Sequence, residues 1–108
     1  MPVMPDTPRE ADLQRCIVDC LECYSLCRQE AMSRRLDRAP FRLMDDCAGI
    51  CRTAADFLLS GSDYAARVCA VCAEICEACA QCCEDIEAPD CARACRGCAE
   101  SCRRIAQR

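Results

Sequence analysis

The sequence lacks histidine and tryptophan, and it contains only two phenylalanines among its 108 residues. Leu, Ile and Val together number 16, so the side chains that usually build a hydrophobic core are scarce. Without histidine, a Gly-rich phosphate loop or a nucleophile beside a base, acyl and phosphoryl transfer have no candidate residues. We therefore expect that the protein is not an enzyme.

Long apolar runs and basic clusters are also missing. Charged residues interrupt every helix-like segment, so none approaches the roughly 18 apolar residues of a membrane span. The formal net charge of −4 argues against nucleic acid as a partner, because phosphate binding needs a surplus of positive charge on one face. Residues 1–10 carry no basic segment, apolar run or cleavage site of an export signal. We expect a cytoplasmic protein that binds neither membrane nor nucleic acid.

Cysteine is the residue that the sequence has in excess, with 16 copies. In a small secreted chain this content would indicate a disulfide scaffold, whereas in a reducing cytosol it indicates metal ligands. Free Cys also behaves as a small hydrophobe and is often buried. We therefore expect the thiols to fill the volume that Leu or Ile would otherwise occupy.

Four helical segments are separated by proline, glycine and serine, and no strand-like alternation occurs. The first is expected to start at a capping box, with Thr7 as N-cap, Pro8 at N1 and Glu10 at N3, and to run to about Leu36. Pro40 is expected to open the second segment, which ends near Ser60 with Gly61 as a left-handed cap. Ser62 is expected to be the N-cap of the third segment, at residues 63–87. The fourth segment follows Pro89 and runs to about Ala106.

Short connections make sequential helices antiparallel neighbours. We predict a single domain over residues 1–108, in which residues 1–6 form a flexible tail. Its fold class is all-α: an antiparallel up-down-up-down four-helix bundle with a cysteine-lined core.

The cysteines of each segment fall on one face. At about 100° per residue they occupy stripes roughly 60 to 80° wide, and charged residues lie mostly opposite. Seven pairs are spaced i, i+4, which accounts for 14 of the 16 cysteines and leaves Cys69 and Cys82: Cys16/Cys20, Cys23/Cys27, Cys47/Cys51, Cys72/Cys76, Cys79/Cys83, Cys91/Cys95 and Cys98/Cys102.

This spacing suits a soft, low-coordinate metal ion. Cβ atoms at i, i+4 are about 5–6 Å apart, and two metal–sulfur bonds of about 2.3 Å would separate the sulfurs of a linear site by about 4.6 Å. Cu(I) accepts two thiolates, whereas Zn²⁺ prefers four ligands. One Cu(I) per thiolate would leave a nearly neutral core, while zinc with four thiolates leaves a buried dianion.

We therefore predict that the sixteen cysteines bind multiple Cu(I) ions per chain. Met44 continues the stripe of Cys47 and Cys51, and it is a candidate thioether ligand at an entry mouth. Leu13, Leu58 and Ile105 are expected to form an apolar plug at the opposite end. Two alternatives stay open: a zinc or cadmium thiolate buffer, and a redox-sensitive structural protein without metal whose cysteines form cross-helix disulfides.

The pattern resembles the bacterial copper storage proteins, which are cysteine-rich four-helix bundles that bind Cu(I). The motifs that carry the resemblance are CIVDCLECYSLC at 16–27, CAGIC at 47–51, CAVCAEICEACAQCC at 69–83 and CARACRGCAESC at 91–102. The resemblance implies copper storage, buffering or detoxification, assembly as a homo-oligomeric tetramer, and membership of a cytosolic branch. Family members often carry His at the open mouth, which this chain lacks.

Overall fold

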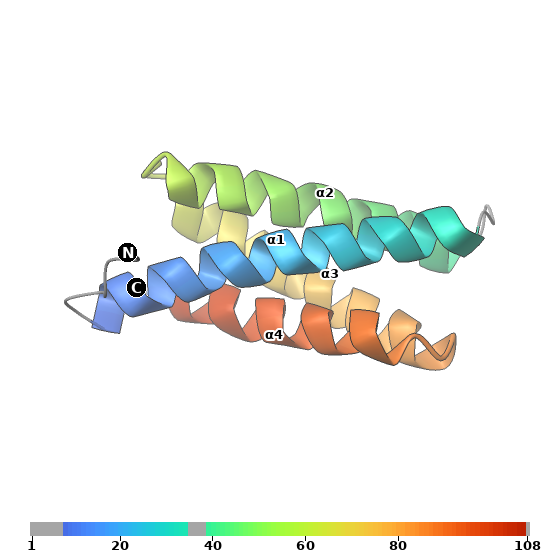
Figure 1. Cartoon of the computed structure of the whole chain (residues 1–108). Helices are drawn as coiled ribbons and strands as arrows, with labels where there is room; N and C mark the ends of the chain where they lie inside the picture. The colour runs from blue at the N-terminus through green and yellow to red at the C-terminus, as the bar shows by residue number, and fades with distance from the viewer. Residues whose placement is uncertain (1–7, 35–38, 108) are drawn as a thin grey trace, which may run out of the picture.

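Four helices make up the computed structural model, which describes the backbone of residues 8–34 and 39–107 and the side chains of 9–34 and 41–107. They are α1 (Pro8–Arg34), α2 (Ala39–Leu59), α3 (Ala65–Asp85) and α4 (Pro89–Ala106). Each helix runs antiparallel to the next one along the chain (Figure 1). No strand occurs within these ranges. The predicted all-α four-helix bundle is confirmed.

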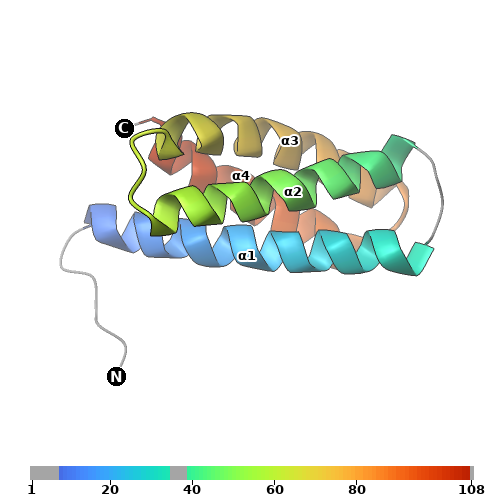
Figure 2. The same ribbon diagram turned by 90° about the horizontal axis from the view of Figure 1, so that it is seen from above.

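The helices surround one central axis. Helix α1 packs against α2 and α4, and α3 packs against the same two neighbours (Figure 2). Over the described residues, the diagonal pairs α1/α3 and α2/α4 make no close backbone contact. Each helix therefore turns one face to the axis. The start of α1, the end of α4 and the α2–α3 turn lie at one end of the bundle, which we call the terminal end. The α3–α4 turn and the last turn of α1 lie at the other, which we call the turn end.

Glycine and proline set the helix boundaries largely as expected. Gly61 adopts a positive φ of 67° just after α2, as predicted for a left-handed cap, and Pro89 is the first residue of α4. Helix α3 ends at Asp85, because Glu87 takes a positive φ of 59° in the turn that follows.

Ser62 does not cap α3 directly, which corrects the prediction. Its hydroxyl accepts a hydrogen bond from the Tyr64 N–H at 3.1 Å, and its carbonyl accepts one from the Ala65 N–H at 3.1 Å. Ser62 thus closes a tight turn, and α3 starts two residues later than expected. The proposed Thr7 cap, the tail at 1–6 and the expected end of the first helix at Leu36 lie outside the described residues.

The core consists mainly of thiols and small side chains. Fifteen cysteines are buried, and alanines occupy many of the remaining buried positions. Only Phe41, Met44 and Leu58 supply large buried apolar side chains among the described residues. The expectation that thiols take the place of Leu and Ile in the core is confirmed.

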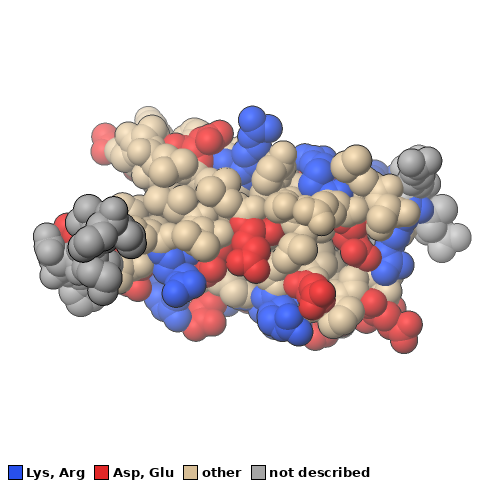
Figure 3. Space-filling model, in the orientation of Figure 1, with Lys and Arg blue, Asp and Glu red and all other residues tan. Residues whose placement is uncertain are grey.

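Ion pairs on the surface link neighbouring helices. Arg96 with Glu84 and Arg103 with Glu77 join α4 to α3, and both signs of charge are interspersed on the face shown in Figure 3. Such exposed pairs contribute only about 0–1 kcal/mol each. None of the four helices, over the described residues, combines the length and the apolar character needed to cross a membrane.

One buried polar contact joins α4 to α1. The Ser101 hydroxyl, 3% exposed, donates a hydrogen bond to the carboxylate of Asp19. Replacing Ser101 with Ala should lower the free energy of unfolding by about 1–3 kcal/mol, because the partly buried carboxylate loses its donor. Urea unfolding of the reduced, metal-free protein measures this loss. The control is Ser25→Ala, which removes an exposed hydroxyl that accepts from Gln29. Equal stabilities for the two variants would contradict the prediction.

Candidate metal centre

The cysteines face the bundle axis because their steps of three and four residues keep them on one side of each helix. Four come from α1, two from α2, six from α3 and four from α4. All sixteen are free thiols, and fifteen of them are buried. We call these fifteen buried cysteines the thiol ladder.

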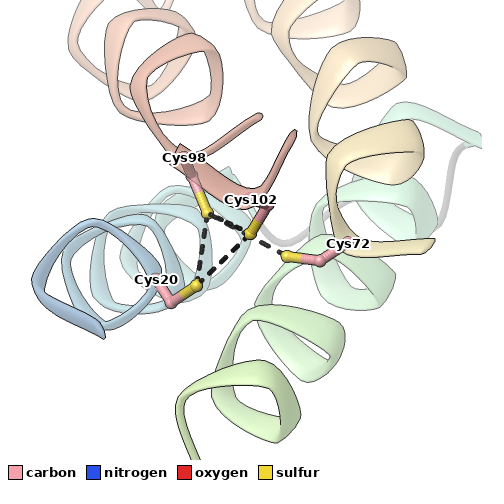
Figure 4. A group of neighbouring side chains, drawn as sticks. All are labelled: Cys20, Cys72, Cys98 and Cys102. Carbon is pink, nitrogen blue, oxygen red and sulfur yellow. Dashed lines mark hydrogen bonds between the residues drawn. The ribbon is translucent and has the colours of Figure 1, made fainter. Parts of the chain in front are cut away.

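A four-thiol group near the terminal end shows how the helices cooperate (Figure 4). The Sγ atom of Cys20 on α1 lies 3.6 Å from that of Cys98 and 3.7 Å from that of Cys102, both on α4. Cys72 on α3 lies 4.0 Å from Cys98. All four sulfur atoms are within 4.8 Å of one another, which makes the group a candidate metal site.

Further four-thiol groups continue along the axis, and each shares two cysteines with the next. The sulfur atoms are therefore continuous along the axis and do not form separate sites. Starting from the terminal end, the ladder begins with the three-thiol group Cys16–Cys69–Cys102 and passes through Cys20–Cys72–Cys98–Cys102, Cys51–Cys72–Cys76–Cys98, Cys23–Cys47–Cys51–Cys76 and Cys23–Cys27–Cys47–Cys95.

Five of the seven i, i+4 pairs predicted from the sequence are in direct sulfur–sulfur hydrogen bonding, at 3.8–4.0 Å. The two other pairs are bridged by a third sulfur from a different helix. Cys76 lies 3.6 Å from both Cys47 and Cys51, and Cys27 lies 3.3 Å from Cys91 and 3.5 Å from Cys95.

The spacing of the sulfur atoms favours sites with more than two ligands. Metal–sulfur bonds of about 2.3 Å place two sulfurs about 4.6 Å apart in a linear site and about 4.0 Å apart in a trigonal one. Four of the six sulfur–sulfur separations within the four-thiol group of Figure 4 are 3.6–4.0 Å, and the other two are within 4.8 Å. A three-thiolate site therefore fits with little movement of the helices. The intrahelical pair predicted from sequence is one part of this larger unit.

Met44 and Cys82 occupy different environments. Met44 is fully buried and shares the face of Cys47, one turn nearer the turn end. Cys47 contacts Cys23 on α1 and Cys76 on α3. Met44 is one turn closer to the turn end, so it lies beside the residues that are one turn beyond Cys23 and Cys76 in that direction. Its side chain therefore belongs to the same buried core as the ladder, and its role as a ligand stays a prediction.

Cys82 lies at the flank of the α3 stripe and is only half-buried. Burial raises the pKa of its thiol, and the neighbouring Cys79 and Asp85 raise it further. Cys82 belongs to none of the seven i, i+4 pairs, and the structure places it at the edge of the ladder. Its role as a ligand also stays a prediction.

Neighbouring thiols of the ladder shift each other's pKa in opposite directions. Hydrogen bonds from Cys27 and Cys83 lower the pKa of Cys79 to about 6, whereas the hydrogen bond with Cys79 and burial raise the pKa of Cys83. A thiolate that accepts the S–H of its neighbour is stabilised, and the neighbour then holds its proton more tightly. Protons must therefore leave this array when its thiolates bind a soft cation.

A four-helix bundle that lines its axis with a continuous array of thiols belongs to the class of proteins that hold several soft metal ions. Comparisons with known proteins identify the family. The sequence model of the copper storage protein family matches residues 8–107. The chain therefore belongs to the copper storage proteins, and the resemblance seen in the sequence is confirmed.

Solved structures agree with this assignment. The Nmul_A1745 protein of Nitrosospira multiformis is 42% identical, with a TM-score of 0.87, over 91% of this chain and 97% of that one. Apo copper storage protein 3 of Bacillus subtilis is 35% identical, with a TM-score of 0.79, over 86% and 97%. A Cu(I)-bound copper storage protein, BsCsp3, is 32% identical, with a TM-score of 0.80, over 88% and 98%. A search of curated proteins gives no significant match.

The difference in burial between Cys82 and the ladder predicts a difference in thiol reactivity. In the reduced, metal-free protein, an alkylating reagent should modify Cys82 first, because the other fifteen cysteines are buried. Denaturation should expose all sixteen. Mass spectrometry of peptides after timed alkylation identifies the sites, and Cys82→Ser should abolish the fast phase. Uniform modification of many cysteines in the folded protein would contradict the described core.

Proposed function

We propose that this protein stores Cu(I) by filling the thiol ladder with many ions, with the sixteen cysteines as ligands and Met44 as an additional one. The observation that carries the proposal is the overlap of the four-thiol groups, each of which shares two sulfurs with the next. Bridging thiolates allow neighbouring ions to form one cluster, which gives a capacity that separate sites would not reach. The Cu(I)-bound relative BsCsp3 supports the choice of metal.

The shared sulfurs favour Cu(I) over zinc. A zinc ion in such a site is held by four thiolates in a tetrahedron. A thiolate that binds zinc in one four-thiol group is then only partly available to a second zinc ion in the neighbouring group that shares it. Cu(I) is monovalent and soft and accepts fewer ligands. At close to one ion per thiolate the filled core is nearly neutral, which avoids the large cost of buried charge.

The metal capacity tests the proposal. Anaerobic titration with Cu(I) against a competing chelator should saturate close to the sixteen thiols of the chain, with little change in helix content. Zinc or cadmium should saturate near one ion per about four thiols. Saturation with only three or four Cu(I) ions would contradict a filled core.

Two single substitutions refine this titration. Cys23 belongs to two of the four-thiol groups, whereas Cys82 lies at the edge of the ladder. Cys23→Ser should lower the affinity of several ions, because neighbouring sites share its sulfur. Cys82→Ser should lower the capacity by one ion at most and leave the affinity of the rest unchanged. Identical effects of the two substitutions would argue against bridging thiolates.

Copper binding should release protons and weaken as the pH falls. Thiolate ligands must lose their protons, and some of these protons are held by thiols such as Cys83, whose pKa is raised by its hydrogen bond with Cys79 and by burial. Lowering the pH favours the protonated thiols, so the apparent affinity should fall, by about tenfold per pH unit for each proton displaced. Chelator competition at pH 8 and pH 6, corrected for the chelator's own titration, measures this. An affinity independent of pH would show that the thiols are already deprotonated.

The setting of this storage function is also part of the proposal. We propose a homo-oligomer, a tetramer by resemblance to the family, that works in the cytoplasm without catalytic activity and without nucleic acid or membrane as a partner. The outer face of α1 offers apolar surface for contacts between chains, since Val18 is 52% and Leu21 43% exposed.

A further inference from the structure

The four-thiol groups also have the dimensions of a site for a tetrahedral cation. Four sulfurs with metal–sulfur bonds of about 2.3 Å lie about 3.8 Å from one another at the corners of a tetrahedron. In the last group of the series, five of the six sulfur–sulfur separations are 3.5–4.0 Å, and the sixth is within 4.8 Å. We call this group the turn tetrad; its members are Cys23, Cys27, Cys47 and Cys95. It fits a tetrahedral ion with little movement of the helices.

The group shown in Figure 4 fits in the same way. We call it the terminal tetrad; its members are Cys20, Cys72, Cys98 and Cys102. The eight thiols of the two tetrads are fully buried. The terminal tetrad draws its sulfurs from α1, α3 and α4, and the turn tetrad draws its sulfurs from α1, α2 and α4. An ion in each tetrad therefore joins three helices at that level of the bundle.

Shared sulfurs limit the number of tetrahedral ions that the ladder can hold. Two inner groups lie between the tetrads. The first shares two sulfurs with the terminal tetrad, and the second shares two with the turn tetrad; they are Cys51–Cys72–Cys76–Cys98 and Cys23–Cys47–Cys51–Cys76. The two inner groups also share two sulfurs with each other. At most two of these four groups can therefore be filled at once without a shared sulfur.

Charge selects the two tetrads as the pair that is filled. Four thiolates and one divalent ion leave a net charge of −2, which is costly to bury without hydrogen bonds. Filling an inner group beside a tetrad brings the thiolates of two sites into contact, because Cys51 lies 3.7 Å from Cys72 and Cys98, and Cys47 lies 3.6 Å from Cys76. When both tetrads are filled, Cys51 and Cys76 remain unligated between them. Their S–H groups are then placed to donate to the thiolates on either side.

We propose that the copper-free protein binds two Zn²⁺ ions tightly, one in each tetrad, and that Cu(I) displaces them when the core fills. The displacement rests on the proposed function, whereas the two sites rest on the sulfur geometry. Each Zn²⁺ forms four Zn–S bonds, and the protons of the thiols pass to solvent. On copper loading, Cu–S bonds form to the same sulfurs while the Zn–S bonds break. Zn²⁺ leaves to solvent, and neither metal changes its oxidation state.

This number is smaller than the thiol count alone would allow. Sixteen thiols could supply about four tetrahedral ions. Any divalent ion beyond the second must share sulfurs with a tetrad or move side chains, so it binds more weakly. Two tight ions are thus a consequence of the register between the helices.

The number of tightly bound ions tests the proposal. Reduced, copper-free protein titrated anaerobically with Zn²⁺ against a competing chelator should hold two ions per chain. Co²⁺, which also takes tetrahedral thiolate sites, should develop the visible absorption of a four-thiolate complex up to the same end point. Any other number of tightly bound ions would overturn the proposal.

Two substitutions on α2 form a matched pair. Cys47→Ser breaks the turn tetrad and the inner group next to it, and the two groups that remain share Cys72 and Cys98. This variant should bind one ion tightly. Cys51 is one turn away and equally buried, but Cys51→Ser leaves both tetrads complete and should bind two ions. Equal end points for the two variants would overturn the assignment of the sites.

A second pair on α4 serves if either α2 variant does not fold. Cys98→Ser leaves two groups that share Cys23 and Cys47, so it should bind one ion tightly. Cys102→Ser leaves the turn tetrad and an inner group that shares no sulfur with it, so it should bind two. Here too, equal end points would contradict the proposal.

Copper loading of the zinc-bound protein separates this inference from the proposed function. Added Cu(I) should release two Zn²⁺ per chain to a zinc indicator, and the final copper capacity should equal that of the metal-free protein. Copper that fills the core while zinc stays bound would overturn the displacement. A protein that takes up only a few Cu(I) ions contradicts copper storage itself. A protein that fills with copper but does not hold two Zn²⁺ ions contradicts only the two zinc sites.

Discussion

The burial of thiols along one axis is the constraint on which the rest of the structure depends. A cysteine side chain is much smaller than Leu or Ile, so a core built from it removes less apolar surface from water per residue. The described core contains few large apolar side chains to compensate, and alanine occupies many of the helix contacts. The helices are thus held by many small contributions: close packing of thiols and alanines, weak S–H···S hydrogen bonds and surface ion pairs.

Metal binding changes this balance. A ligand that binds the folded state more tightly than the unfolded state stabilises the fold by mass action, although cysteines of an unfolded chain also bind soft metals and reduce the gain. Sulfur atoms already 3.6–4.0 Å apart need little rearrangement to accept an ion. The metal-free bundle is therefore preorganised, and its modest apolar core is sufficient because it keeps the thiols in place before copper arrives.

The sequence was enough to predict the four helices, their antiparallel order and the inward cysteine stripes, because each depends on spacing within one segment. Gly61 and Pro89 marked boundaries for local reasons of backbone geometry. The cross-helix thiol groups could not be predicted, since they depend on the register of one helix against another. The hydrogen bond from Arg34 to the Ile86 carbonyl could not be predicted for the same reason, because the two residues are 52 apart in sequence.

Helix α2 shows why register matters more than the number of ligands. It contributes only Cys47 and Cys51, and from sequence alone it would be judged a thinly ligated wall. In the structure, Cys47 contacts sulfurs on all three other helices, namely Cys23, Cys76 and Cys95. Cys51 reaches Cys98 across the diagonal at 3.7 Å. The helix with the fewest cysteines thus joins the thiols of α1, α3 and α4 at the middle of the ladder.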